Sequence, residues 1–307
     1  MEFLALLLLL LGLSLVVGGA ELFFAGLLAS AERLRVSPFA LTAVVSGLEI
    51  ENIATGIAAN AKGLPGAAAG TFLGGATFLA WGVAGLGALI RPLRADLPPW
   101  VIVWTAVSPL PLFALALDGD LSRADGAFLV VWGLVALVGV ARSGRRIGFD
   151  QPLERSKLGR LTAPLALIGG LGLLTAGGAA LGEGLRRVVE RFQISATLLG
   201  NTVIAASVEA EEVARVAVPA RRGRGDVALR NILGTIVHFL ALNAGIIALV
   251  RPLSLNSATL DLHLPVAVGS TLVLGATLAV RGGVGRAEGA AFLMLYAAYV
   301  AAAIIVA

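Results

Sequence analysis

The sequence contains no cysteine, only two histidines and few charged residues. A chain without cysteine can form neither a disulfide nor a thiolate metal site, and the two histidines, His238 and His263, are too few for a usual zinc ligand set. Charged residues make up 14% of the 307 residues, hydrophobic residues make up 58%, and the mean hydropathy is +0.93. Because a soluble domain cannot bury so much apolar surface, the composition predicts an integral membrane protein.

Long apolar runs divide the chain into ten predicted membrane spans, so the expected fold class is all-α. Each run is close to the ~20 residues that cross a bilayer core as a helix. The runs are 3–30, 38–61, 65–90, 98–117, 124–141, 161–185, 196–220, 231–250, 263–280 and 287–306. The first run has no basic segment before it and no clear cleavage site after it, so we interpret it as a retained span rather than a secretory signal.

The basic residues are unevenly distributed among the segments that connect these spans. Of the 23 lysines and arginines, sixteen follow odd-numbered spans, six follow even-numbered spans, and Arg215 lies within the seventh span. The positive-inside rule then predicts that the odd-numbered connections are cytoplasmic and that both termini face outside. The sequence pI near 10.3 therefore reflects membrane topology, and we expect no nucleic-acid partner.

The two halves of the chain resemble each other. At an offset of 160 residues, LIRPL at 89–93 aligns with LVRPL at 249–253. From residue 49 to residue 93, fourteen of the forty-five aligned positions are identical, where about four would be expected by chance. At an offset of 158, ERLRVS at 32–37 aligns with ERFQIS at 190–195. The chain therefore contains an internal repeat.

Each half holds five predicted spans, an odd number, so the second copy must enter the membrane from the side opposite to the first. We therefore expect two inverted five-helix repeats, at residues 1–142 and 161–307, joined by a basic cytoplasmic loop at residues 143–160. Transporters built from inverted repeats usually bind their substrate near the bilayer midplane, between the repeats.

Acidic and amide residues occupy the centre of one predicted span in each repeat. They are Glu49, Glu51 and Asn52 in the second span and Glu209, Glu211 and Glu212 in the seventh. A charge at the centre of a bilayer costs several kcal/mol, so two copies at one depth indicate a shared functional site. A cluster of oxygens suits a hard cation such as calcium, which takes about six to eight oxygen ligands.

Helical periodicity places these residues on two faces. Positions three apart share a face, so Glu49 lies with Asn52, and Glu209 lies with Glu212. Glu51 is roughly 200° away from Glu49 around the helix and is expected to face a neighbouring helix. The alternative for all the acidic residues is a structural role, in which a protonated carboxyl forms a hydrogen bond between helices. For Glu51 and its counterpart in the second repeat, we leave the two roles open.

Short motifs around these spans carry a family resemblance. RVS and QIS precede spans two and seven, and a glycine-containing stretch follows each: NAKGLPGAAAGTFLGG at 60–75 and ARRGRGDVALRNILGTI at 220–236. With ten spans in two inverted halves, this pattern resembles the calcium/cation antiporter superfamily, which includes sodium/calcium and proton/calcium exchangers. The resemblance implies alternating access, in which spans one and six slide against a core of spans two, three, seven and eight.

The motif of that superfamily is Gly-Thr-Ser-Leu-Pro-Glu in spans two and seven, whose glutamate and hydroxyl oxygens hold the ion. In this sequence the glutamate position holds Asn52 in the first repeat and Glu212 in the second. Carboxylates replace the serine and the proline of the motif in both repeats. The replacements are Glu49 and Glu209 for serine, and Glu51 and Glu211 for proline.

The ligand positions of spans three and eight also differ from the superfamily pattern. The resemblance places the Asn or Asp ligand of those spans at Leu79 and Phe239, which carry no oxygen in their side chains. Thr77, His238 and Asn243 are the nearby polar alternatives.

The replacement of hydroxyls by carboxylates bears on the coupling ion. Sodium sites in the superfamily use Ser, Thr and carbonyl oxygens, whereas a carboxyl that is desolvated or lies beside another has a raised pKa and can carry a proton. We therefore expect calcium or another divalent cation to be exchanged for protons, with sodium coupling as the alternative. These ions are substrates, and no resident cofactor is expected.

Arg215 lies four residues after Glu211 and three after Glu212, where ion pairs along a helix can form. It could form a buried salt bridge, extend its head group toward the cytoplasm, or take the place of a bound cation.

Two other functional classes remain to be weighed. A cation channel could use the glutamates as a selectivity ring. An intramembrane enzyme would need a histidine metal pair or a Ser/His/Asp set at matched depth, which the sequence does not contain. We therefore expect a transporter rather than an enzyme, in a bacterial or archaeal plasma membrane, with no obligate protein partner.

Overall fold

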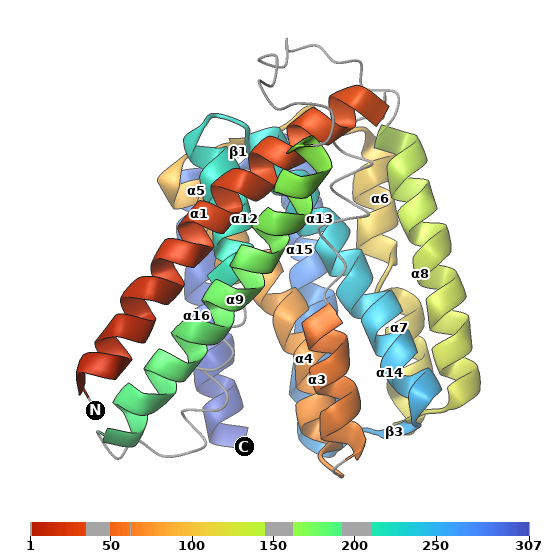
Figure 1. The fold of residues 1–307 in the computed structure, drawn as a ribbon. Helices are drawn as coiled ribbons and strands as arrows, with labels where there is room; N and C mark the ends of the chain where they lie inside the picture. Colours follow the sequence, from red (N-terminus) through yellow and green to blue (C-terminus); the bar gives the residue numbers. More distant parts are fainter. Residues whose placement is uncertain (1, 35–49, 62, 145–161, 192–209, 307) are drawn as a thin grey trace. The chain divides into compact units, whose positions relative to one another are not determined.

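The computed structural model describes residues 2–34, 50–61, 63–144, 162–191 and 210–306, and most of these residues are helical (Figure 1). Within the described residues, eight helices are long and apolar enough to cross a membrane. They are Leu4–Leu34, Pro65–Ile90, Pro99–Asp118, Arg123–Ser143, Thr162–Leu181, Gly225–Val250, Thr259–Arg281 and Arg286–Val306. These eight correspond to the predicted spans other than the second and the seventh, which confirms the helical membrane class.

The predicted second and seventh spans are described only in their later halves. These halves are α3 (Ile50–Ala61) and α12 (Ala210–Arg221), and their earlier halves lie outside the described residues. The count of ten spans therefore stays a prediction. The predicted loop at residues 143–160 also lies almost wholly outside the described residues.

The spanning segments differ in their regularity. Long continuous helices form α1 (Glu2–Leu34), α8 (Arg123–Gly144), α9 (Thr162–Arg191), α15 (Leu264–Arg281) and α16 (Arg286–Val306). Two spans have a π-helical segment in their middle. One consists of α4 (Pro65–Thr77), η1 (Phe78–Val83) and α5 (Ala84–Ile90), and the other of α13 (Gly225–Val237), η4 (His238–Asn243) and α14 (Ala244–Val250). The fourth span consists of α6 (Pro99–Val107), α7 (Leu110–Leu115) and η2 (Ala116–Asp118). A third π-helical segment, η5 (Thr259–His263), leads into α15.

The internal repeat of the sequence is present in the structure. The elements α3, α4, η1, α5 and β1 (Leu93–Arg94) recur 160 residues later, with the same lengths, as α12, α13, η4, α14 and β3 (Leu253–Ser254). Gly63 and Gly223, which follow α3 and α12, both have φ of 76°, a left-handed conformation that glycine adopts without strain. The π-helical segments η1 and η4 are therefore a property of the repeat and not a local irregularity.

Local sequence signals explain several helix ends. Pro65 occupies the first turn of α4, where its missing N–H has no helical partner to lose. Before α8, the backbone N–H of Ser122 donates to Asp125 at 2.8 Å, and the backbone N–H of Asp125 donates to the Ser122 hydroxyl at 3.2 Å. This reciprocal pair is a capping box that satisfies the free donors of the first turn.

The contacts divide the chain into two compact units that cut across the repeats. The first unit contains α1, α9 and α12, and the second contains the remaining described elements. Each unit takes elements from both repeats. The predicted domain boundaries, which follow the repeats, stay a prediction.

In the second unit, the two spans that contain η1 and η4 form the core and run in opposite directions. The strand β1, which follows α5, lies at one end of the unit, and β3, which follows α14, lies at the other (Figure 1). Helix α4 packs against η4, and α13 packs against η1. Large side chains from both spans, Phe72, Leu79, Leu229 and Phe239, are fully buried there.

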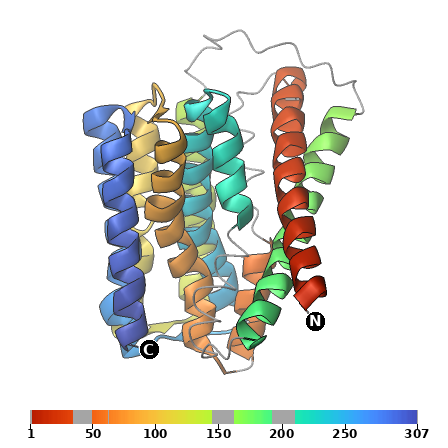
Figure 2. The same ribbon diagram turned by 90° about the vertical axis from the view of Figure 1, so that its left-hand side faces the viewer.

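Short antiparallel strand pairs and outer helices link the two repeats within the second unit. β1 pairs with β4 (Gly283–Val284), and β2 (Asp120–Leu121) pairs with β3. Helix α16 packs beside α5, as Figure 2 shows, and α8 packs beside α14 in the same way. Every one of these contacts joins an element of one repeat to an element of the other.

In the first unit, α1 and α9 pack side by side with opposite directions (Figure 2). Small residues line the contact at intervals of seven: Ala5, Gly12, Gly19 and Gly26 in α1, and Gly170, Gly177 and Gly184 in α9. A Cβ added to Gly19 would lie 3.0 Å from the carbonyl oxygen of Gly170, and one added to Gly170 would lie 2.8 Å from that of Gly19. The two backbones are therefore in direct contact, which larger side chains would prevent.

Candidate functional site

Three of the six predicted site residues cannot be placed. Glu49 and Glu209 lie outside the described residues. Glu51 belongs to α3, but its side chain also lies outside what the structure describes. Their proposed roles therefore rest on the sequence.

The other three predicted residues are all buried. Asn52 on α3 is 5% exposed, and Glu211 and Glu212 in the first turn of α12 are 2% and 1% exposed. A buried carboxylate needs a charged or hydrogen-bonding partner, because removal of its hydration costs several kcal/mol. The surroundings of the two glutamates therefore decide what they can do.

Arg215 supplies a partner to both glutamates. Its Nη2 lies 3.2 Å from Oε2 of Glu211, and its Nη1 pairs with Oε1 of Glu212. The arginine side chain is 1% exposed, so it does not extend its head group out of the protein. The buried salt bridge, one of the three roles considered for Arg215, is thus present.

Helix α1 completes the surroundings of α12 within the first unit. The Cζ atom of Arg215 lies 5.7 Å from the ring centre of Phe23, a cation–π contact. Further along, Arg222 pairs with Glu21 and lies over the ring of Phe24 at 5.2 Å. The sequence pattern of α12 allowed its internal ion pairs as one alternative, but no signal in the sequence indicated these aromatic partners on a distant helix.

The polar residues of the eighth span, in the second unit, are buried as well. Thr235, His238 and Asn243 are each at most 3% exposed. Within the part of the chain that the structure describes, the Thr235 hydroxyl and both amide atoms of Asn243 have no hydrogen-bond partner. Asn243 was among the predicted polar alternatives, whereas Thr235 was missed, although a lone hydroxyl in a buried apolar helix is a usable signal.

Three other positions considered in the third and eighth spans offer no free side-chain ligand. The Thr77 hydroxyl donates to the backbone carbonyl of Leu73 at 2.8 Å, which satisfies it within its own helix. Leu79 and Phe239, at the positions of the superfamily's Asn or Asp ligands, are fully buried apolar side chains. Neither of them can coordinate an ion.

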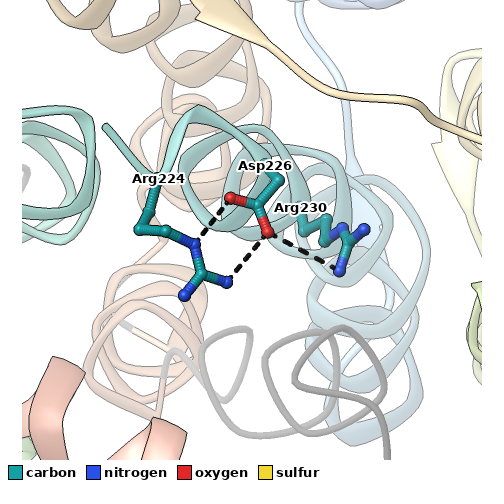
Figure 3. Close-up of polar contacts among 3 residues, drawn as sticks. All are labelled: Arg224, Asp226 and Arg230. Carbon is teal, nitrogen blue, oxygen red and sulfur yellow. Dashed lines mark hydrogen bonds and ion pairs between the residues drawn. The ribbon is translucent and has the colours of Figure 1, made fainter. Parts of the chain in front are cut away.

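A second charged cluster lies at the start of α13, also in the second unit (Figure 3). The Nε and Nη2 atoms of Arg224 donate to the two carboxylate oxygens of Asp226 at 3.0 and 3.1 Å. On the other side of the same carboxylate, Nη1 of Arg230 lies 4.0 Å from Oδ2. Asp226 also lies in the first helical turn, where a negative charge interacts favourably with the helix dipole.

The position of Arg230 corrects the sequence prediction. We expected Arg230 in a connecting segment before a span at 231–250, but the helix begins at Gly225 and Arg230 is 8% exposed. Arg230 can be buried in the helix because it pairs with Asp226 one turn earlier. A hydropathy score counts the charge of Arg230 but does not include this ion pair. The cluster fixes the start of the helix that carries Thr235 and His238.

No group of three or more His, Cys, Asp or Glu side chains that could hold a metal occurs within the described ranges. Among the described residues, the first unit thus contains a buried acidic pair with an arginine, and the second unit contains buried neutral oxygens and amides.

The duplicated helical fold and the buried intramembrane carboxylates define a membrane ion transporter. Residues 4–141 and 162–305 match the family described as sodium/calcium exchanger protein. The chain belongs to this family. The expected resemblance to calcium/cation antiporters is thereby confirmed, and so is the expectation of a transporter rather than an enzyme.

Individual relatives cover most of the chain. It is 31% identical over 274 residues to the inner membrane protein YrbG of Escherichia coli K12, an alignment that covers 81% of each chain. It is 27% identical to the putative antiporter CaxA of Alkalimonas amylolytica, over 94% of this chain and 95% of that one. Its fold is similar to that of the sodium-calcium exchanger NCX_Mj, with a TM-score of 0.86 and 24% identity over 98% of this chain and 99% of that chain.

Proposed function

We propose that the chain is a secondary-active antiporter that exchanges calcium or another divalent cation for protons by alternating access. The observation that carries this proposal is the buried acidic pair of α12, Glu211 and Glu212, in a member of the exchanger family. Ionisable residues within a membrane span are costly and usually mark an ion path. Carboxylate oxygens are the hard ligands that divalent cations such as calcium prefer.

We assign ten transmembrane helices to the chain, as two inverted five-helix repeats with both termini outside. The recurrence of five elements at an offset of 160 supports the duplication, and the opposite directions of the two core spans support the inversion. The excess of basic residues after odd-numbered spans supports the orientation. A bacterial or archaeal plasma membrane is the expected location.

Cation binding is assigned to residues of both repeats. The proposed ligands are Glu49, Asn52, Glu209 and Glu212, with Glu51 and Glu211 as further candidates. The burial of Asn52 and Glu212, which are equivalent in the repeat, supports their inclusion. The ion pair between Glu211 and Arg215 supports a structural role for Glu211 in addition.

The proposal is tested with the purified chain in proteoliposomes and a panel of cations. We expect an imposed proton gradient to drive calcium accumulation, and Glu49→Gln and Glu212→Gln to abolish calcium binding, as measured by isothermal titration. If binding and flux of every cation are indifferent to both substitutions, the site lies elsewhere. A channel is separated from a carrier by trans-acceleration, because only a carrier is accelerated by the counter-ion.

Sodium coupling is the second candidate, and one observation favours it. Thr235 and Asn243 are buried, and within the described residues their side-chain oxygens have no hydrogen-bond donor. Neutral oxygens of this kind suit sodium better than a proton. A sodium gradient that drives calcium flux at clamped pH would select sodium and rule out obligatory proton exchange.

A further inference from the structure

Arg215 is a buried basic residue that the proposed transport cycle does not use. Its single guanidinium bridges both described carboxylates of α12, at 3.2 Å from Glu211 and in an ion pair with Glu212. Both partners lie one turn earlier on the same helix, so the arginine side chain extends back toward the start of α12.

Helix α1 holds the guanidinium without adding a charge. The Phe23 ring lies 5.7 Å from Cζ of Arg215, and the contact belongs to the packing of α1 against α12 in the first unit. An aromatic face attracts a cation through its quadrupole. The positive charge of Arg215 is therefore available to balance the carboxylates beside it.

A comparison of the two repeats indicates which carboxylate Arg215 serves. At the offset of 160, Glu212 corresponds to Asn52, and Arg215 corresponds to Thr55. The copy with an acid at the glutamate position of the motif has a base three residues later, whereas the copy with an amide there has a neutral residue. The two positions together are therefore neutral in each repeat. This indicates that the arginine balances the carboxylate of Glu212.

We propose that Arg215 is a tethered counter-cation for Glu212, which the transported cation must displace. This inference rests on the proposed function, in which Glu212 binds the ion. Calcium coordinates carboxylate oxygens at roughly 2.3–2.6 Å, so a bound ion and the guanidinium cannot share the same oxygen without strong repulsion. Arginine has a long, flexible stem, so it leaves Glu212 by rotation of its side chain while Glu211 still pairs with it.

The tethered charge changes what the unloaded carrier can do. A carrier with a bare buried carboxylate resists reorientation, because an uncompensated charge in a low-dielectric interior is costly to move. Arg215 lowers that cost when no ion is bound, because its positive charge balances one of the two carboxylates. The unloaded form therefore returns without a counter-ion, and calcium moves down its own gradient in addition to being exchanged.

The test uses the full chain in proteoliposomes, with radiolabelled calcium ions, equal pH on both sides and no sodium. Arg215→Gln removes the competing charge, so the KM for calcium falls about tenfold, which corresponds to ~1.4 kcal/mol. The unchanged chain takes up calcium at equal pH, whereas uptake by this variant requires an imposed proton gradient. Arg215→Lys keeps a charge but cannot bridge two carboxylates, so its KM for calcium lies between those of the unchanged chain and Arg215→Gln.

Arg222→Gln is the matched control. Arg222 also pairs with a glutamate and an aromatic ring of α1, but it is half-exposed and ten residues, roughly 15 Å of helix, beyond Glu212. We expect its KM and its independence of a counter-ion to equal those of the unchanged chain. An equal KM shift in Arg222→Gln and Arg215→Gln would mean a general electrostatic effect and would overturn the inference.

Two further outcomes separate this inference from the proposed function. If Glu212→Gln leaves calcium binding intact, the proposed site is wrong and the role of Arg215 falls with it. If Glu212→Gln abolishes binding while Arg215→Gln keeps the original KM and needs no counter-ion, only the tethered counter-cation is wrong. Should Arg215→Gln fail to fold, Glu211→Gln/Arg215→Gln, which leaves a single unpaired carboxylate, gives the same readouts.

Discussion

The two repeats share a backbone but differ in their charges. Helices α3 and α12 have the same length, the same following glycine at φ of 76°, and are continued by spans with the same π-helical turn. Yet α12 carries the ion-paired Glu212 and Arg215, where α3 carries Asn52 and Thr55. Duplication has therefore preserved the geometry of the helices, whereas the electrostatics of the two copies have diverged.

The same divergence occurs at the next helix. The cluster of Arg224, Asp226 and Arg230 at the start of α13 has only Leu64, Gly66 and Gly70 as its counterpart at the start of α4. Conversely, Asn60 at the end of α3 donates to the carbonyl oxygens of Arg251 and Pro252, and its counterpart at the end of α12 is Ala220. Each repeat thus has polar contacts that the other lacks, and these contacts can be removed one at a time.

The largest expected effect comes from Glu212→Gln, which gives the second repeat a neutral side chain at this position, as Asn52 does in the first. Removal of one partner of a buried ion pair typically costs about 3–5 kcal/mol. We expect the lower end, because Glu211 still pairs with Arg215. Thermal unfolding in detergent measures the loss, and Asn52→Gln, which keeps an amide, is the control. An unchanged unfolding temperature would contradict the buried pair.

Gly19→Leu tests a feature that the two repeats share, the backbone contact between α1 and α9. A leucine side chain would collide with the carbonyl oxygen of Gly170, and overpacking of this kind costs about 1–3 kcal/mol. The neighbouring Gly18 has no atom within 4 Å of an added Cβ, so Gly18→Leu is the control and should be tolerated. Equal losses in the two variants would argue against the close contact.

Asp226→Asn makes the start of α13 more like that of α4, which has no charge there. The substitution removes the carboxylate between Arg224 and Arg230, and Arg230 is 8% exposed, so we expect a loss of about 2 kcal/mol. The measurement is the unfolding temperature in detergent. Asp125→Asn, in an exposed capping box of α8, should cost less, and the reverse order would contradict the burial of the cluster.

The smallest effect is expected for Asn60→Ala, which gives the first repeat the residue of the second. Asn60 makes its two contacts at 2.9 and 3.3 Å from a part-buried position, so their loss should cost about 1 kcal/mol. Transport kinetics should stay unchanged, because no predicted ion ligand is touched. A changed KM for calcium would show that this contact takes part in the transport cycle.

Much of the fold could be predicted from the sequence, because hydropathy and self-similarity act over long stretches. The offset of 160 predicted the correspondence of α3 with α12, and helical spacing offered the pairing of Arg215 with Glu211 and Glu212 as one of three roles. Neither signal depends on how distant segments pack.

Features that depend on packing between distant segments could not be predicted. The Phe23 contact of Arg215, the pairing of β1 with β4 and the π-helical turns have no local sequence signature. The start of α13 was placed too late because Arg230 scores as a loop residue until its partner Asp226 is known. Glu49, Glu51 and Glu209 remain predictions from the repeat alone.

The small residues that line the contact between α1 and α9 have a mechanical consequence. Because the two helices touch through their main chains from one end of the contact to the other, neither can tilt or rotate far without carrying its partner along. They form a rigid helix pair with one helix from each repeat. A displacement at one end of the pair would then move its other end, without rearrangement of side chains between the two helices.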